Sequence, residues 1–97
     1  MALLAVRHDV RDYDDFRAVY DSMSELQRQW GVTAESVHQL AGSPNTVLIL
    51  HHFATAAQAD AFLTSRELRA AMQRAGVEGD PRVEIYVQPG AGHELDR

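Results

Sequence analysis

Three of the five histidines, His8, His38 and His51, lie in apolar or alternating segments where a buried imidazole could do chemistry. Imidazole titrates close to neutral pH, so it can act as a general base and remove a proton from an acidic carbon. The segment VLILHHF at residues 47–53 reads as a buried strand that ends in two adjacent histidines. Because successive strand side chains point to opposite faces of a sheet, His51 and His52 must have different surroundings.

The elements that position these histidines follow from the apolar spacing. Alternation and helical periodicity predict four strands and two helical segments in the order βαββαβ. We expect strands at residues 2–8, 32–40, 47–53 and 82–88, and helical segments at 12–30 and 55–75. This order is that of the ferredoxin-like α+β unit, a four-stranded antiparallel sheet with both helical segments on one side. Residues 1–89 are predicted to form one domain, and residues 90–97 a polar tail.

Local capping signals mark the predicted helices. Asp12 is a good N-cap for the first segment. Thr55 with Gln58 is typical of a capping box, and Thr64 with Glu67 of a second one. The second helical segment is therefore expected to break near residue 65.

Strand alternation divides the sheet residues into an inner face, under the helices, and an outer face. The expected inner face comprises Leu4, Val6, His8, Ala34, Ser36, His38, Leu40, Val47, Ile49, His51, Phe53, Val83, Ile85 and Val87. The expected outer face comprises Leu3, Ala5, Arg7, Thr33, Glu35, Val37, Gln39, Leu48, Leu50, His52, Glu84, Tyr86 and Gln88. The outer set is half apolar, which favours packing against another sheet over contact with water.

Three histidines could then converge beneath the helices. If the turn pairs Leu40 with Val47, Ser36 lies opposite His51 and His38 opposite Ile49. With the first strand parallel beside the third, His8 falls near His51. Tyr20 is the helix residue best placed to hydrogen-bond a buried imidazole. The expected catalytic residues are therefore His51, His38 and His8.

Apolar side chains are expected to form the walls of a cavity that holds a flat substrate and excludes water. The candidate substrate-binding residues are Phe16, Tyr20, Met23, Trp30, Phe53, Phe62 and Met72. The same helical spacing is also that of an ordinary core, which is the alternative interpretation.

Composition narrows the class of partner. With 9 basic and 14 acidic residues the formal net charge is −5, which argues against nucleic acid and anionic membranes as partners. The absence of cysteine excludes disulfides and thiolate metal sites and favours a reducing cytoplasm. We expect no signal peptide in MALLAV and no membrane span. No short-spaced pair of metal ligands occurs, so no metal site and no cofactor are predicted.

Three segments together resemble the dimeric α+β barrel superfamily, and most closely its antibiotic-biosynthesis-monooxygenase-like proteins. They are HDVRDYDDFRAVYDS, GVTAESVHQLAGSPNTVLILHHF and the pattern AxAFLxSxxLRxAMxxAGV from Ala59 to Val77. The resemblance implies a homodimer whose two sheets form a central barrel, with a ligand cavity in each subunit. Members of the superfamily include cofactor-independent oxygenases of polycyclic aromatic polyketides, polyketide cyclases and haem-degrading enzymes. No residue set in this chain matches one of these activities position by position.

The function expected from the sequence is that of an enzyme with a small hydrophobic substrate. Its histidine base would deprotonate an anthrone or polyketone, and the carbanion would react with oxygen without a cofactor. Ring closure or isomerisation by the same base is one alternative. A non-catalytic ligand-binding or metal-binding protein is the other.

Overall fold

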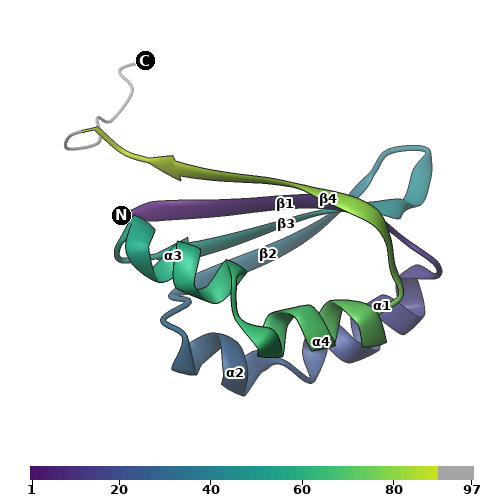
Figure 1. Cartoon of the computed structure of the whole chain (residues 1–97). Coiled ribbons are helices and arrows are strands. Elements are labelled where there is room, and N and C mark those ends of the chain that lie inside the picture. The colour runs from purple at the N-terminus through teal and green to yellow at the C-terminus, as the bar shows by residue number, and fades with distance from the viewer. Residues whose placement is uncertain (90–97) are drawn as a thin grey trace, which may run out of the picture.

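The computed structural model describes residues 1–89, and the predicted polar tail at residues 90–97 lies outside the described residues. A four-stranded sheet carries all the helices on one side (Figure 1). The elements are β1 (Ala2–Val10), α1 (Tyr13–Asp21), α2 (Ser24–Gln29), β2 (Ala34–Leu40), β3 (Ser43–Phe53), α3 (Ala56–Leu63), α4 (Arg66–Arg74) and β4 (Val77–Val87). The strand order is β2-β3-β1-β4, and every neighbouring pair is antiparallel. The predicted ferredoxin-like α+β class is confirmed.

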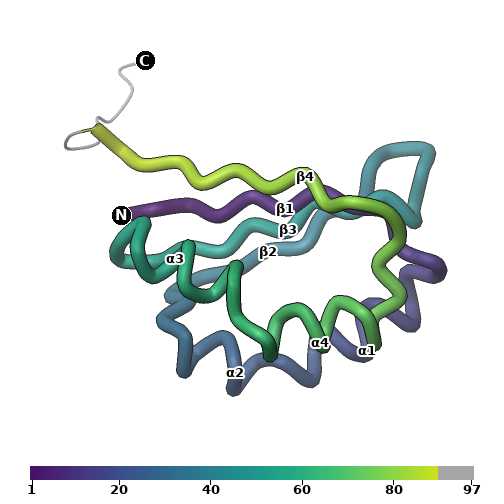
Figure 2. Tube along the Cα trace, in the orientation of Figure 1, coloured from purple at the N-terminus to yellow at the C-terminus, as the bar shows by residue number. Residues whose placement is uncertain are grey.

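Both helical segments are divided in two. The Asp12 carboxylate accepts a hydrogen bond from the Asp15 N–H at 3.0 Å and starts α1 as expected. The first segment then breaks, because the Ser22 hydroxyl bonds back to the Val19 carbonyl and α2 begins only at Ser24. Figure 2 shows the two pairs of short helices running beneath the sheet.

The break in the second helical segment was expected, but its N-cap differs from the prediction. The Thr55–Gln58 capping box is present at the start of α3. At the start of α4 the capping oxygen belongs to Ser65, which accepts from the Leu68 N–H at 3.2 Å. Thr64 instead closes α3, since its hydroxyl donates to the Asp60 carbonyl at 3.0 Å.

The two central strands set the positions of His8 and His51. In the β1–β3 register, Leu4 lies opposite His51 and His8 lies opposite Val47. The prediction that the first strand runs parallel to the third, with His8 close to His51, is wrong. β2 runs parallel to β1 after the helical crossover, and the hairpin then turns β3 back, so β3 must run against β1.

The edge strand β2 has the opposite phase to the one predicted. Glu35 lies opposite His51, and His38 lies opposite Leu48. The hairpin reverses tightly around Gly42, whose φ of 81° is readily adopted only by glycine, and the register shifts between Gln39 and Leu40. A slip of one residue moves every side chain of a strand to the other face. The prediction that Ala34, Ser36, His38 and Leu40 lie on the inner face is therefore wrong. Glu35, Val37 and Gln39 lie on that face instead.

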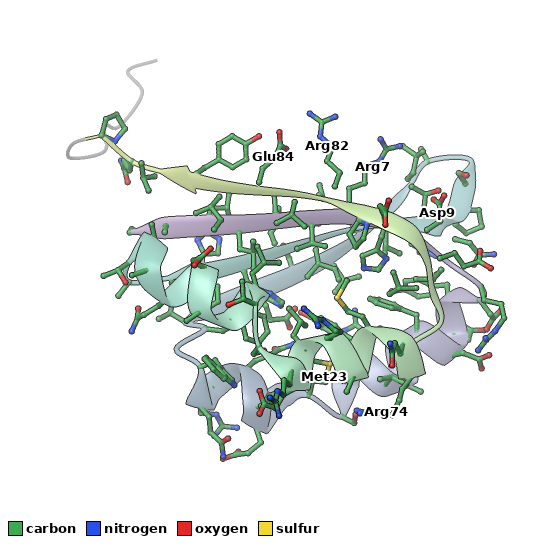
Figure 3. All side chains as sticks on the ribbon, in the orientation of Figure 1. Arg7, Asp9, Met23, Arg74, Arg82 and Glu84 are labelled. Atoms are coloured by element: carbon green, nitrogen blue, oxygen red, sulfur yellow. The ribbon has the colours of Figure 1, made fainter. Side chains whose placement is uncertain are left out.

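β4 begins earlier than expected and contains an irregularity. Arg7 pairs with Arg82, whereas Asp9 pairs with Glu78. Three residues of β4, 79–81, therefore lie opposite the single β1 residue His8 and form a bulge. Gly79 in this bulge has a φ of 68°. On the outer face, Arg7, Arg82 and Glu84 point away from the helices (Figure 3).

The core has two apolar clusters beneath the sheet. One is built from Val10, Phe16, Tyr20, Val47, Ile49 and Ala75, and the other from Leu4, Val6, Phe53, Ala59 and Phe62. His51 lies between them, with its ring 6.0 Å from that of Tyr20 and 5.5 Å from that of Phe62. Within residues 1–89, no helix is long and apolar enough to cross a membrane.

Candidate functional site

A small cavity of about 40 Å³ lies between the inner face of the sheet and the helices. Its lining residues are Leu4, Val6, His8, Phe16, Tyr20, Met23, Ile49, His51, Phe62, Leu63, Leu68, Ala71, Met72, Ala75 and Val77. Two imidazoles and one phenol are the polar groups in this otherwise apolar lining. Small-molecule sites usually measure about 300–1,000 Å³. At this volume the cavity is too small for a polycyclic substrate, which could enter only if the lining residues moved apart.

His51 is the best-connected polar group of the cavity. Its side chain is buried on β3, and its Nε2 lies 3.0 Å from the Tyr20 hydroxyl oxygen. The Tyr20 hydroxyl in turn donates to Glu35 Oε2 at 2.8 Å. The other ring nitrogen, Nδ1, is buried without a hydrogen-bond partner. Burial lowers the pKa of His51 to about 4, so the ring is neutral at pH 7.

His8 lies on the same face but lacks such partners. It is buried on β1, and its ring meets that of Phe16 edge-on at 5.6 Å. Its Nδ1 also has no partner, and burial lowers the pKa of this histidine. The register places His8 across from Val47, four residues before His51, which corresponds to about 13 Å along a strand. The two imidazoles therefore occupy different ends of the cavity.

The expectation that His38 faces the helices is wrong. His38 is exposed on the outer face, and its Nε2 lies 2.9 Å from the Ser36 hydroxyl oxygen. The reversed phase of β2 accounts for this position. The convergence of three histidines is therefore not observed.

Most of the predicted cavity walls are in place. Phe16, Tyr20, Met23, Phe62 and Met72 line the cavity. Phe53 and Trp30 do not, because both pack behind Phe62, with ring centroids 5.7 and 6.4 Å from its ring. Phe53 at the end of β3 and Trp30 at the C-cap of α2 therefore support the Phe62 ring.

Glu35 is the functional candidate that the sequence analysis assigned to the wrong face. It reaches the inner side of the sheet directly opposite His51. The signal that could have found it is the Ala41–Gly42 pair, which favours a tighter turn than the one assumed.

A second, larger hollow of about 310 Å³ lies at the bulge of β4. It is lined by Arg7, His8, Asp9, Glu78, Gly79, Asp80 and Arg82. Its charged lining lies beside His8 and away from the Tyr20–His51 pair. Within the described residues, no three His, Asp or Glu side chains lie close enough together to hold a metal ion.

No family model matches the sequence, and no curated protein is similar to it. Solved structures with the same architecture are numerous. A candidate antibiotic biosynthesis monooxygenase from Deinococcus radiodurans superposes with a TM-score of 0.75 over 99% of this chain and 100% of that one, at 16% identity. A similar candidate from Bordetella bronchiseptica has a TM-score of 0.75 over 90% of this chain and 96% of that one, at 14% identity.

SnoaB, a cofactor-independent oxygenase from Streptomyces nogalater, superposes with a TM-score of 0.74 over 93% of this chain and 94% of that one, at 8% identity. Identities this low establish a common fold and leave the reaction open. The chain thus has the fold of the antibiotic-biosynthesis-monooxygenase structures, and the resemblance expected from its sequence is confirmed at that level.

Proposed function

We propose that the protein is a cofactor-independent monooxygenase of a small aromatic or polyketide-like molecule, with His51 as its general base. The observation that carries the proposal is a buried histidine, His51, that lines an apolar cavity and has an Nδ1 without a hydrogen-bond partner. A buried polar atom without a partner is uncommon and is costly for stability. Such an atom is well suited to meet a ligand. The shared fold with SnoaB adds support.

The chemistry needs one base, molecular oxygen and an apolar space. A C–H proton of the substrate passes to Nδ1, and the electron pair left on carbon delocalises into the aromatic system. The carbanion reduces oxygen and forms a C–O bond, and the resulting peroxide takes the proton back from His51. Loss of water then leaves a ketone, so one CH₂ group and one O₂ give one C=O group and one water.

His51 is uncharged at neutral pH, as a general base must be before it accepts a proton. Because burial lowers its pKa to about 4, His51 is neutral at pH 7 and one of its ring nitrogens keeps a free lone pair. An imidazolium formed in the cavity is compensated by the carbanion beside it, since opposite charges attract strongly in a medium of low dielectric constant. Phe16, Tyr20, Met23, Phe62 and Met72 are the proposed substrate-binding walls.

Oxygen uptake with an anthrone tests the proposal. The wild-type protein is expected to consume one O₂ per anthrone and release the corresponding quinone. Replacement of His51 by Gln is expected to abolish most of this activity, whereas His38→Gln on the outer face should leave it unchanged. An H51Q variant that consumes oxygen as fast as the wild type would contradict the assignment of the base.

Ligand binding without turnover is the alternative that the apolar lining of the cavity would also allow. A protein of this kind would bind an anthrone, quench its fluorescence and take up no oxygen. Ring closure or isomerisation by the same base would give a rearranged product of unchanged mass. Mass spectrometry of the product therefore separates the three functions.

We also propose that two copies associate through the outer faces of their sheets. Leu48 and Tyr86 are exposed there, at 36% and 50%. Such apolar side chains on a helix-free face favour burial against another sheet. Leu48→Glu should shift sedimentation toward the monomer, whereas Arg69→Glu on α4 should not.

The proposed location of the protein is the cytoplasm, because a sequence without cysteine suits a reducing compartment.

A further inference from the structure

Three polar side chains from three elements form a continuous chain beneath the sheet. Glu35 on β2 lies directly opposite His51 on β3, and Tyr20 on α1 lies against both. The Tyr20 oxygen is 2.8 Å from Glu35 Oε2 and 3.0 Å from His51 Nε2. The chain runs from an exposed carboxylate to a buried imidazole.

Counting protons assigns a direction to this chain. A carboxylate only accepts hydrogen bonds, so the single Tyr20 proton must be donated to Glu35. The Tyr20 oxygen can then only accept from His51, which requires the proton of the imidazole to be on Nε2. A neutral imidazole carries one N–H, so Nδ1 retains its lone pair.

The charge states needed for this count agree with the surroundings. Burial raises the pKa of Tyr20, and the adjacent Glu35 raises it further, so the phenol keeps its proton. Burial keeps His51 neutral at pH 7. The other charged or titratable groups nearby are Arg17, whose guanidinium lies 5.5 Å from the centre of the Tyr20 ring, and His52, the next residue on β3.

We propose that Glu35 and Tyr20 are positioning residues that hold His51 in the Nε2–H tautomer and leave Nδ1 as the atom that receives the substrate proton. The tautomer part of this inference stands on the hydrogen-bond geometry alone. The assignment of Nδ1 as the base rests on the proposed function. The opposite proton order would require a protonated Glu35 and would place the proton on Nδ1.

Nitrogen-15 NMR of the full chain with labelled histidine tests the tautomer without a substrate. At pH 7 we expect His51 Nδ1 to resonate as an unprotonated nitrogen, and the Nε2 proton to be downfield and slow to exchange with water. Tyr20→Phe removes the acceptor, so this proton should lose its downfield shift and its protection. Glu84→Gln alters a carboxylate on the outer face and should change neither signal.

Glu35→Gln provides a second variant at a surface-exposed position, where folding is not at risk. Because the Glu35 carboxylate raises the pKa of His51, its removal should lower the pH at which His51 titrates. If the His51 proton is on Nδ1 in the wild type, or if its Nε2 signal is unchanged in Y20F, the positioning inference is overturned.

Turnover separates this inference from the proposed function. With an anthrone and oxygen, Y20F and E35Q are expected to lower kcat by about 10–100-fold, as the loss of orienting partners does for other histidines, with little change in KM. If wild-type His51 carries its proton on Nε2 but the H51Q variant remains fully active, the positioning inference stands and the assignment of His51 as the base is rejected. If H51Q loses activity but the Nε2 signal is unaltered in Y20F, His51 stands as the base and the positioning inference is rejected.

Discussion

The two ends of the cavity each hold a buried imidazole, but the two imidazoles differ in their hydrogen-bond partners. His51 is held between Tyr20 and Phe62 and is connected through Tyr20 to a carboxylate. His8 meets the edge of the Phe16 ring, and its Nδ1 has no hydrogen-bond partner. Burial lowers the pKa at both positions, so burial alone does not distinguish them. What distinguishes the His51 end is the set of groups that fixes one ring nitrogen and leaves the other free.

The largest expected difference between the ends is in turnover. We predict that His51→Gln lowers kcat for an anthrone by about 10²–10⁴-fold, the usual contribution of a general base. His8→Gln should lower it by less than about tenfold, since glutamine retains a polar group and most of the volume. Oxygen uptake under saturating substrate measures both. Equal losses in the two variants would remove the distinction between the ends.

Packing around each imidazole provides the second test. Phe62 and Phe16 meet His51 and His8 edge-on at 5.5 and 5.6 Å. Truncating either ring to alanine should cost about 3–5 kcal/mol of unfolding free energy, because both are buried. Urea unfolding measures this cost. In NMR spectra, F62A should shift the His51 ring protons most and F16A those of His8, and the reverse pattern would contradict the arrangement.

The pH dependence of stability should be dominated by His51. The ordinary pKa of histidine is 6.5, and burial lowers that of His51 to about 4, so the unfolded chain binds a proton first as the pH falls. The full stability is present above pH 6.5 and is lost progressively down to about pH 4, by about 3 kcal/mol. Urea unfolding between pH 7 and 4 measures the loss. H51Q should flatten this dependence more than H8Q, and an unchanged slope in H51Q would show that other groups control it.

The smallest effects are expected at two glycines that shape the strands beside the imidazoles. Gly42 and Gly79 have φ values of 81° and 68°, and an added Cβ would meet nothing within 4 Å at either site. Replacement by alanine should therefore cost only the backbone penalty of about 1–2 kcal/mol. G42A should disturb the His51 Nε2 signal through the phase of β2, while G79A should disturb His8. Thermal unfolding measures the cost, and Gly42→Asn should recover part of it.

The predictable parts of this molecule are those where local chemistry and burial agree. The inward position of His51 followed from a strand whose alternate residues are strongly apolar, Val47, Ile49 and Phe53. The start of α1 at Asp12 followed from capping. In these places a single-residue error would have exposed apolar surface or left a helix end without a partner, so the sequence tolerates only one solution.

β2 could not be predicted in the same way. Its two alternate sets are both mixtures of small, polar and apolar residues, so burial gives no preference for either phase. The phase is decided by the turn at Gly42, and with it whether Glu35 or His38 faces the helices. Trp30 was predicted to be a cavity wall, but at the C-cap of α2 it packs against the Phe62 ring instead.

The division of both crossovers into short helices has a consequence for the cavity that they cover. α4 has nine residues between Ser65 and the Ala75–Gly76 end, and Gly76 has a φ of 76°. A helix of this length has little stability of its own, so we expect it to open locally more readily than the central strands. We expect the amides of α4 to exchange with deuterium faster than those of β1 and β3. Leu68, Ala71 and Met72 of α4 line the cavity, so a displacement of this helix would enlarge it.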